Sequence, residues 1–279
     1  IKDTYKTKEK IMNNSLTEEQ VKVLNMSQSV INEVRKVIIG KDEIIIKVLL
    51  SILAGGHILI EDIPGVGKTT LAVALSKALS LDYKRLQFTP DILPTDVTGF
   101  TILNKETHKF EYKQGAALTN LFLADEINRT SSKTQSALLE VMEEGKVTVD
   151  GITHKMPDPY IVIATQNPVG SIGTQMLPES QMDRFIVRLT MGYPNLESEV
   201  ALLQSKQNLV PVDNVMPVVS AEDILQARKV VETLYVSDQV IQYIVMLANA
   251  TRNNEYIKLG LSYSWNILNK DMTACKYGQ

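Results

Sequence analysis

A glycine-rich turn followed by a lysine and two threonines occupies residues 65–70 of the sequence, GVGKTT. Gly65 and Gly67 allow the backbone to turn its N–H groups toward phosphate oxygens, and a helix that begins near Lys68 would point its positive end at the same place. The Lys68 ammonium would reach the β- and γ-phosphates of a nucleoside triphosphate, and the Thr69 hydroxyl would ligate Mg²⁺. The segment predicts a triphosphate site; the alternative is an ordinary glycine turn before a core helix.

Asp62 is the one departure from the common phosphate-binding pattern G-x-x-x-x-G-K-[ST], because it stands where the first glycine is expected. It lies at the end of an apolar run, at the position of the motif farthest in sequence from Lys68. A carboxylate there could brace the loop from behind. The order of strand, turn and helix around the motif favours the triphosphate site despite this departure.

Two adjacent carboxylates, Asp125 and Glu126, close the apolar run LFLADE at 121–126. At the end of a strand, Asp125 can hold the magnesium shell while Glu126 polarises a water molecule for attack on the γ-phosphate. The pair predicts hydrolysis of the triphosphate. The alternative is a helix cap within DEINRTS, which the phosphate-binding motif upstream disfavours.

Two further polar residues lie next to later apolar runs. Asn167 follows one of them in IVIATQNP, where its amide could hold the attacking water or contact the γ-phosphate, but an Asn before Pro is also a common turn former. Arg184 precedes the last run in LPESQMDRF. It either pairs with Asp183 or projects into the site of a neighbouring subunit to stabilise transition-state charge, and we favour the second.

Five short apolar runs, separated by helical patterns, must position these side chains. Such runs read as buried parallel strands. Between them, apolar residues recur three and four apart, as in KTTLAVALSKALS and SKTQSALLEVMEEG. We predict an α/β fold with a parallel sheet wrapped by helices, and a candidate site at the carboxyl edge of that sheet. The five runs are HILIED at 57–62, KRLQFT at 84–89, LFLADE at 121–126, YIVIAT at 160–165 and RFIVRL at 184–189.

The pattern becomes purely helical after MGYPNLESE, with Pro194 as the expected hinge. Near the other end, a first helix is expected to start at Ser15 or Thr17, after a solvated arm. The predicted organisation is a flexible arm at residues 1–14, a nucleotide-binding α/β domain at 15–194 and a small all-α lid domain at 195–279, atypical or incomplete at its C-terminus.

Composition bounds the remaining classes of function. The near balance of 29 basic and 32 acidic residues argues against the broad basic surface of a nucleic-acid-binding protein. The single cysteine, Cys275, excludes an internal disulfide framework, and the apolar stretch at 44–60 is too interrupted to span a membrane. A cytoplasmic location is the default expectation. His57, His108 and His154 are expected to be solvated or structural rather than metal ligands.

Four segments together resemble those of the AAA+ ATPases, and most closely the MoxR family. The resemblance runs from about Ile31 to Gly260 and rests on VIIGKDEIIIKVLLSILAGGHILIEDIPGVGKTTLA, LFLADEINRTSSKTQSALLEVMEEGKVTV, IATQNP and LPESQMDRF, in that order. An acidic residue before IPGVGKT or VPGVGKT is common in this family, so the resemblance also covers Asp62. It implies a P-loop NTPase fold, ATP and Mg²⁺ as ligands, and ATP hydrolysis.

By position, the resemblance assigns a role to each candidate residue. Those that would act in catalysis are Lys68 of Walker A, Glu126 of Walker B, Asn167 as sensor 1 and Arg184 as an arginine finger acting on the adjacent protomer. Those that would hold Mg²⁺ are Thr69 of Walker A and Asp125 of Walker B. Those that would hold the nucleotide are Ile38, Ile39 and Gly40 around the adenine, and Pro64, Gly65, Val66, Gly67, Lys68, Thr69, Thr70 and Asp125 around the phosphates.

Two segments fit inserts of this clade and also read as hairpins from their residues. Residues 99–117 carry a polar centre between β-forming arms, and residues 144–160 carry Asp-Gly at a turn. By resemblance, the first is the helix-2 insert and the second is the hairpin before sensor 1. In ring ATPases of this kind such hairpins face the central pore, so they are expected to transmit the nucleotide state to a client.

The resemblance also implies partners. It predicts a homo-oligomer, expected to be a hexamer, that remodels or activates a client or co-chaperone protein, and MoxR proteins are often associated with partners that carry a von Willebrand factor A domain. Three other functions stay open: a nucleotide-regulated binding module with little turnover, a P-loop small-molecule kinase and, against the acidic balance, a DNA translocase. The kinase would leave Arg184 and the two hairpins without a role.

The last residues depart from the family pattern. MoxR proteins usually carry G-x-S-P-R at the start of a lid helix, with the Arg as sensor 2, whereas Tyr263 and Ser264 occupy those two positions here. Sensor 2 is therefore missing from this sequence. A natural variant, a truncated fragment and a shifted reading frame after Ser262 are the three explanations. Each puts ATP turnover in question more than nucleotide binding.

Overall fold

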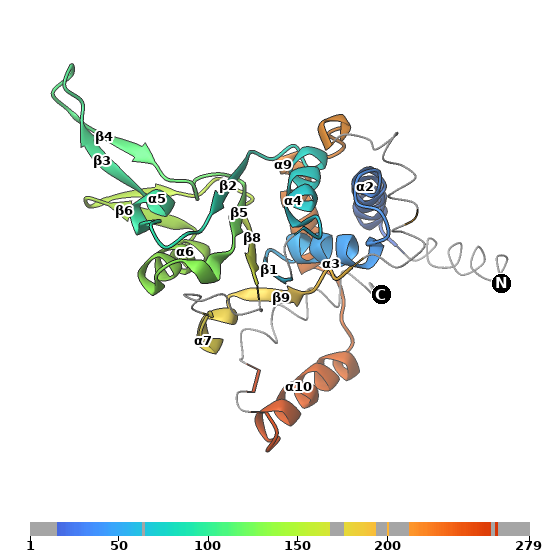
Figure 1. Cartoon of the computed structure of the whole chain (residues 1–279). Helices are drawn as coiled ribbons and strands as arrows, with labels where there is room; N and C mark the ends of the chain where they lie inside the picture. The colour runs from blue at the N-terminus through green and yellow to red at the C-terminus, as the bar shows by residue number, and fades with distance from the viewer. Residues whose placement is uncertain are drawn as a thin grey trace.

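Figure 1 shows a computed structural model of the chain. Some predicted features lie outside the described residues, namely the arm at 1–14, Ser15, Pro64, the hinge Pro194, and the tail with Tyr263, Ser264 and Cys275. The residues that the structure describes are 16–62, 65–167, 176–193, 200, 212–257 and 260–261.

Five parallel strands form the central sheet, in the order β2-β5-β8-β1-β9. Each strand lies within, or within one residue of, one of the five apolar runs, so the predicted parallel sheet is confirmed. Because the strands are parallel, their carboxyl ends meet at one edge. The strands are β1 His57–Glu61, β2 Tyr83–Gln87, β5 Leu121–Asp125, β8 Ile161–Gln166 and β9 Phe185–Leu189.

Helices cover both faces of the sheet, as the side chains of β5 illustrate. Leu121 and Leu123 belong to one buried cluster, shared with α2, α3 and α4, whereas Phe122 and Ala124 belong to a second, shared with α6. All four side chains are fully buried, which explains why β5 is apolar from Leu121 to Ala124. The helices are α2 Glu18–Arg35, α3 Asp42–Leu53, α4 Lys68–Ala78, α5 Pro94–Thr98, α6 Ser132–Glu144, α7 Glu179–Met182, α9 Ala221–Glu232 and α10 Asp238–Arg252, with 3₁₀ helices η1 Ile127–Arg129 and η3 Val212–Asn214.

Side-chain caps fix the starts of several helices. The Thr17 hydroxyl accepts a hydrogen bond from the Gln20 N–H, and the Gln20 side chain accepts one from the Thr17 N–H, which forms a capping box before α2. Of the two predicted starts, Ser15 and Thr17, the second is confirmed. The hydroxyls of Ser131 and Ser220 cap α6 and α9 in the same way.

Two hairpins extend from the α/β body, on the side away from α2 (Figure 1). Asp150 and Gly151, at the turn of the second hairpin, have φ of +48° and +78°, as an Asp-Gly turn of type I′ requires. The Tyr112 ring stacks on the His154 ring with centroids 3.8 Å apart, so the two hairpins touch. The predicted hairpins at 99–117 and 144–160 are confirmed. Their strands are β3 Gly99–Leu103 with β4 Phe110–Gln114, and β6 Lys146–Val149 with β7 Ile152–Lys155.

The helices α9 and α10 differ in their packing. α9 packs against α2 and α3, and its Ile224 and Val231 belong to the first apolar cluster of the sheet. α10 buries only Ala248 and lies apart from the sheet in Figure 1. Neither α10 nor any other helix in the described ranges is long and apolar enough to cross a membrane. A division into two domains at residue 194 stays a prediction. The exposed apolar side chains of α10 are Val240, Ile241, Tyr243, Val245, Met246 and Leu247.

Candidate functional site

The glycine-rich turn between β1 and α4 presents open backbone. Gly65 and Gly67 have φ of +87° and +92°, the left-handed region that favours glycine. Apart from the chain neighbours of each glycine, no residue in the described part of the chain has an atom within 4 Å of the place that a β-carbon would take. α4 begins at Lys68 without a side-chain cap from Gly67, so the backbone N–H groups of its first turn lack such an acceptor. The turn and the helix start together offer donors to an anion.

Lys68 is buried among acidic groups. The residue is 9% exposed, and its Nζ donates to the backbone carbonyl of Asp62 at 2.8 Å. Burial lowers the pKa of Lys68, while the charges of Asp125, Asp62 and Glu126 act in the opposite direction. The amine thus lies within electrostatic reach of the acids at the end of β5.

The other residues of the motif frame this amine. Val66 packs against the first apolar cluster and anchors the turn to the core. Thr69 and Thr70, both half-buried, continue the first turn of α4. The Thr69 hydroxyl therefore belongs to the same helix start as Lys68.

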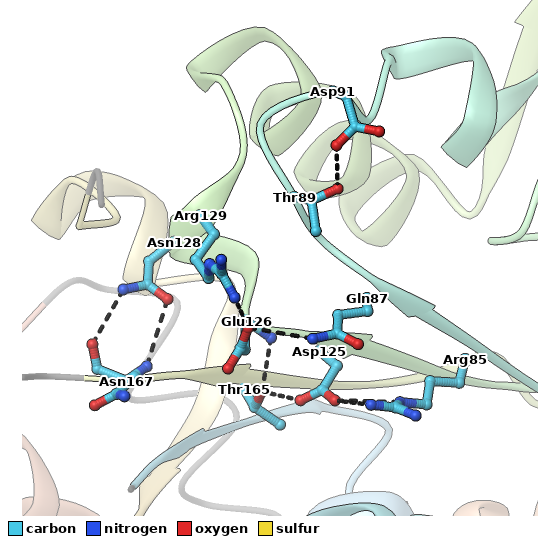
Figure 2. Close-up of polar contacts among 10 residues, drawn as sticks. All are labelled: Arg85, Gln87, Thr89, Asp91, Asp125, Glu126, Asn128, Arg129, Thr165 and Asn167. Atoms are coloured by element: carbon cyan, nitrogen blue, oxygen red, sulfur yellow. Dashed lines mark hydrogen bonds and ion pairs between the residues drawn. The ribbon is translucent and has the colours of Figure 1, made fainter. Parts of the chain in front are cut away.

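Asp125 ends β5 and is held from both sides. Its Oδ2 accepts hydrogen bonds from Arg85 Nε at 3.1 Å and Arg85 Nη2 at 2.7 Å, and its Oδ1 accepts one from the Thr165 hydroxyl at 2.6 Å (Figure 2). Arg85 comes from β2 and Thr165 from β8, the two strands that flank β5. Only 8% of Asp125 is exposed, and a carboxylate at this depth needs such partners.

Glu126 turns the chain away from the strand. Its φ of +57° and ψ of +47° are left-handed, which is uncommon for a residue with a side chain. Its N–H donates to the Thr165 hydroxyl at 2.8 Å, the same hydroxyl that bonds Asp125. Its Oε2 accepts from Arg129 Nη1 at 2.7 Å and from Gln87 Nε2 at 3.4 Å (Figure 2). One threonine therefore fixes both acidic residues.

Asn167 lies at the end of β8, beside the 3₁₀ turn η1. Asn128 Nδ2 donates to the Asn167 carbonyl at 3.1 Å, and the Asn167 N–H donates to Asn128 Oδ1 at 3.4 Å (Figure 2). Asn128 is fully buried, so this double contact ties the end of β8 to the turn after β5. Asn167 and Glu126 thus lie at the same edge of the sheet.

Arg184 lies at the other end of the sheet. It precedes Phe185, which pairs in register with His57, the first residue of β1. Its Nη2 and Nε donate to Glu143 Oε2 of α6 at 2.7 and 3.0 Å. The two alternatives considered from the sequence were Asp183 and the site of a neighbouring subunit, and Glu143 was not among them. The structure does not bring Arg184 to the phosphate loop of its own chain.

The segment assigned to the adenine lies between α2 and α3. Ile38 is only 6% exposed and belongs to the first apolar cluster, against which Val66 also packs. Ile39 is half-buried, and Gly40 is exposed with φ of +73°. Ile38 therefore serves the core, and Ile39 and Gly40 present more surface to a ligand.

Several partners of the acidic pair and of Asn167 were not predicted from the sequence. They are Arg85, Gln87, Asn128, Arg129 and Thr165. A signal existed for the first two, because Arg85 and Gln87 are polar residues two apart in a run read as a buried strand, and such residues share one face. Their targets depend on the pairing of β2 with β5, which the sequence does not reveal.

The residues present fit a magnesium triphosphate. Thr69 supplies a hydroxyl and Asp125 a carboxylate, the hard oxygen ligands that Mg²⁺ prefers, and Mg²⁺ usually completes its shell with phosphate oxygens and water. The open backbone at Gly65 and Gly67 leaves space for those phosphates. Within the described residues, no group of three His, Cys, Asp or Glu forms a separate metal site.

His57 has a structural role at the amino end of β1. The Val162 N–H donates to its Nδ1 at 3.1 Å, which leaves Nε2 to donate to the Met142 carbonyl at 3.2 Å. Burial is the main cause that lowers the pKa of His57 from 6.5 to about 4. The ring is neutral and ties β1 to β8 and α6, as expected of a structural histidine.

Comparisons with known proteins agree with this geometry. Residues 57–187 match the family model for the ATPase family associated with various cellular activities (AAA). The chain is 48% identical over 232 residues to the uncharacterized protein YeaC of Bacillus subtilis, with 83% of this chain and 72% of YeaC covered. It is 36% identical over 233 residues to Chaperone MoxR1 of Mycobacterium tuberculosis, with 84% and 61% covered.

A solved structure is also similar. A crystal structure from Cytophaga hutchinsonii, provisionally described as an ATPase, superposes with a TM-score of 0.83 at 38% identity. The superposition covers 92% of this chain and 82% of that one.

Proposed function

This chain belongs to the MoxR family of AAA+ ATPases, and from that premise we propose that it binds ATP with Mg²⁺ and hydrolyses it to ADP and phosphate. The observation that carries the proposal is the burial of Lys68 in the field of Asp125 and Glu126, next to open backbone at a helix start. A buried amine among acids, facing a ready-made anion site, is suited to a ligand that brings both negative phosphates and a cation.

Each residue then has a definable task. Lys68 and the N–H groups of the turn bind the phosphates, and Thr69 and Asp125 hold Mg²⁺, which when bound offsets the charge of the phosphate oxygens. Glu126 accepts a proton from the attacking water, and Asn167 orients that water. Thr165 fixes Asp125 and Glu126 through its hydroxyl.

The test of turnover is Glu126→Gln, which keeps the size of the side chain and removes the base. We expect kcat for ATP hydrolysis to fall by about a hundredfold or more, because general-base catalysis contributes on that order. Glu140→Gln, an exposed change on α6, is the matched control. Equal hydrolysis by Glu126→Gln and the native protein would remove the enzymatic claim.

We extend the proposal to a homo-oligomeric ring, with six protomers expected, that acts on a client or co-chaperone protein in the cytoplasm. The position of Arg184 supports a role outside its own site, because it lies at the far end of the sheet from Lys68. The relative from Mycobacterium tuberculosis is named a chaperone. Exposed apolar side chains on the contacting hairpins, among them Phe110 and Ile152, are candidates for client contact.

Sedimentation with and without Mg²⁺ and ATP tests the ring. We expect an assembly near six protomers with nucleotide, and a stable monomer with bound ATP would contradict it. A purified von Willebrand factor A domain is the first partner to assay. Loss of its binding in Phe110→Ser, with Leu24→Ser on α2 as a control for exposed apolar residues, would support the hairpin as the contact.

A second candidate function is a nucleotide-regulated binding module with little turnover. The observation that favours it is the 2.7 Å ion pair between Glu126 and Arg129, which holds the base in contact with a cation of its own chain. Micromolar affinity for ATP without hydrolysis, and hydrolysis released by Arg129→Gln, would support this second function.

A further inference from the structure

The short segment after β9 is held by two charged side chains from distant parts of the chain. Lys41 Nζ donates to three successive carbonyls, those of Met191 at 2.5 Å, Gly192 at 3.1 Å and Tyr193 at 2.8 Å. Asp62 Oδ2 accepts a hydrogen bond from the Gly192 N–H. Both polar groups of the Gly192 backbone are therefore bound to ions rather than to a neighbouring strand.

The residues that carry these two charged side chains flank the nucleotide-binding elements in sequence. Lys41 follows Gly40, at the end of the segment assigned to the adenine, and Asp62 follows β1 at the entrance to the phosphate loop. The Asp62 carbonyl accepts from Lys68 Nζ at 2.8 Å. Asp62 therefore touches the lysine of the phosphate loop with its backbone and Gly192 with its side chain.

Gly192 has a backbone conformation that glycine adopts more easily than other residues. Its φ of +62° is in the left-handed region that favours glycine, and no described residue other than its chain neighbours has an atom within 4 Å of where a β-carbon would be. The backbone conformation, and not a lack of space, is what calls for glycine here. A glycine held between two charged side chains, as Gly192 is between Lys41 and Asp62, can change its dihedral angles when those side chains change partners.

We propose that Asp62 and Lys41 are positioning residues that couple occupancy of the phosphate loop to the segment at 191–193. The inference rests on the proposed nucleotide binding, and it gives a task to the carboxylate found where the motif expects glycine. When phosphates draw the Lys68 ammonium away from the Asp62 carbonyl, the attraction between Lys68 and the Asp62 carboxylate weakens. The carboxylate then binds the Gly192 N–H more strongly.

Amide hydrogen exchange of the segment at 191–193 tests this coupling on the full chain, without nucleotide and with saturating Mg²⁺ and ADP. In the native protein, we expect ADP to slow exchange of the Gly192 amide by about tenfold, the scale of one hydrogen bond to a charged group. In Asp62→Ala, exchange is expected to be fast in both states. ADP affinity, measured by calorimetry on the same samples, is expected to change by less than about threefold, because no side-chain contact to phosphate is removed.

Conservative variants separate coupling from simple loss of structure. Asp62→Asn keeps a carbonyl acceptor but no charge, so it is expected to protect Gly192 without a response to ADP. Lys41→Met keeps the aliphatic stem but removes the charge, so the Gly192 amide is expected to lose its protection against exchange. Lys41→Arg is expected to restore that protection. Glu140→Gln serves as the control for loss of one exposed carboxylate.

The outcomes separate the two proposals. ADP binding with the same exchange of Gly192 in both states would overturn the coupling and leave the nucleotide site intact. An equal response to ADP in Asp62→Ala and the native protein would also overturn it. No ADP binding by the native protein would remove both proposals.

Discussion

The two ends of the parallel sheet both bury ionisable side chains, but they satisfy them in different ways. At the amino end, His57 is neutral and bonds only to main-chain groups, the Val162 N–H and the Met142 carbonyl. At the carboxyl end, the side-chain oxygens of Asp125 and Glu126 bond to other side chains.

This difference separates rigid support from adaptable chemistry. A main-chain partner is fixed by the sheet, so the histidine cannot exchange it without disrupting the strands. A side-chain partner such as Arg85 or Arg129 can rotate away when a stronger ligand arrives. The carboxyl edge therefore holds a set of charges that a magnesium triphosphate can rearrange, and the amino end holds the strands in place.

The largest expected effect is at the carboxyl end. Lys68→Met should weaken ATP binding by about a hundredfold or more, because it removes a charge-assisted contact to phosphate in a poorly solvated site. Calorimetry with Mg²⁺ and ATP measures this, with Lys77→Met near the end of the same helix as the control. Unchanged affinity in Lys68→Met would contradict both the site and the contrast between the two ends.

A change at the amino end should affect folding alone. His57→Phe leaves the Val162 N–H and the Met142 carbonyl without their partner, and should lower the free energy of unfolding by about 2–4 kcal/mol. Affinity for ATP should not change. Chemical denaturation and calorimetry on the same variant provide both readouts. A parallel loss of ATP affinity would contradict the purely structural role of His57.

The histidine also predicts a pH dependence. Its pKa is about 4 when folded and 6.5 when exposed, so the unfolded chain binds more protons between these values. The stabilisation is complete above pH 6.5 and is lost as pH falls toward 4, by about 3 kcal/mol in total. Denaturation curves across this range should show the slope in the native protein, and His57→Phe should lack that component.

A smaller effect is expected from a change of Thr165, which holds the two acidic residues at the carboxyl end in place. Thr165→Val keeps the shape and removes the hydroxyl that joins Asp125 to the Glu126 N–H, at a cost of about 1–3 kcal/mol in unfolding free energy. ATP hydrolysis should fall with it, and Thr165→Ser should restore both. Restoration of stability without activity would mean that Thr165 does not position the acids.

The smallest effect is expected from Arg85→Gln. Arg85 is partly exposed, so its ion pair with Asp125 should contribute about 1 kcal/mol or less to stability. Removing this competing cation should lower the Mg²⁺ concentration needed for half-maximal ATP binding by about two- to fivefold. Arg188→Gln, which removes the cation of the Glu61 ion pair, is the control. A higher Mg²⁺ requirement in Arg85→Gln would instead show that the arginine orients Asp125 for the metal.

Local sequence patterns were sufficient for the elements. Leu121 to Ala124 are buried on both faces because helices cover both, and an uninterrupted apolar run expresses that condition directly. The Asp150-Gly151 turn is similarly local, since its positive φ angles favour those residue types. In such places the residues and their immediate neighbours decide the structure.

Contacts across strands were beyond the reach of these patterns. Arg85 meets Asp125 only because β2 lies next to β5, and Thr165 reaches both acids only because β8 lies on the other side. The Glu143 partner of Arg184 depends on the packing of α6. The sequence showed that Asp62 was unusual, but its hydrogen bond to Gly192 spans 130 positions and follows from the tertiary fold.

The exposed apolar side chains of α10 affect how a functional ring can be distinguished from a non-specific aggregate. Tyr243, Met246 and Leu247 point to solvent on a helix that buries a single alanine, and surfaces of this kind adhere to one another in water. Particles formed through them would be large, heterogeneous and indifferent to nucleotide. A functional ring should therefore be identified by its appearance with Mg²⁺ and ATP and its absence in Lys68→Met, and not by particle mass alone.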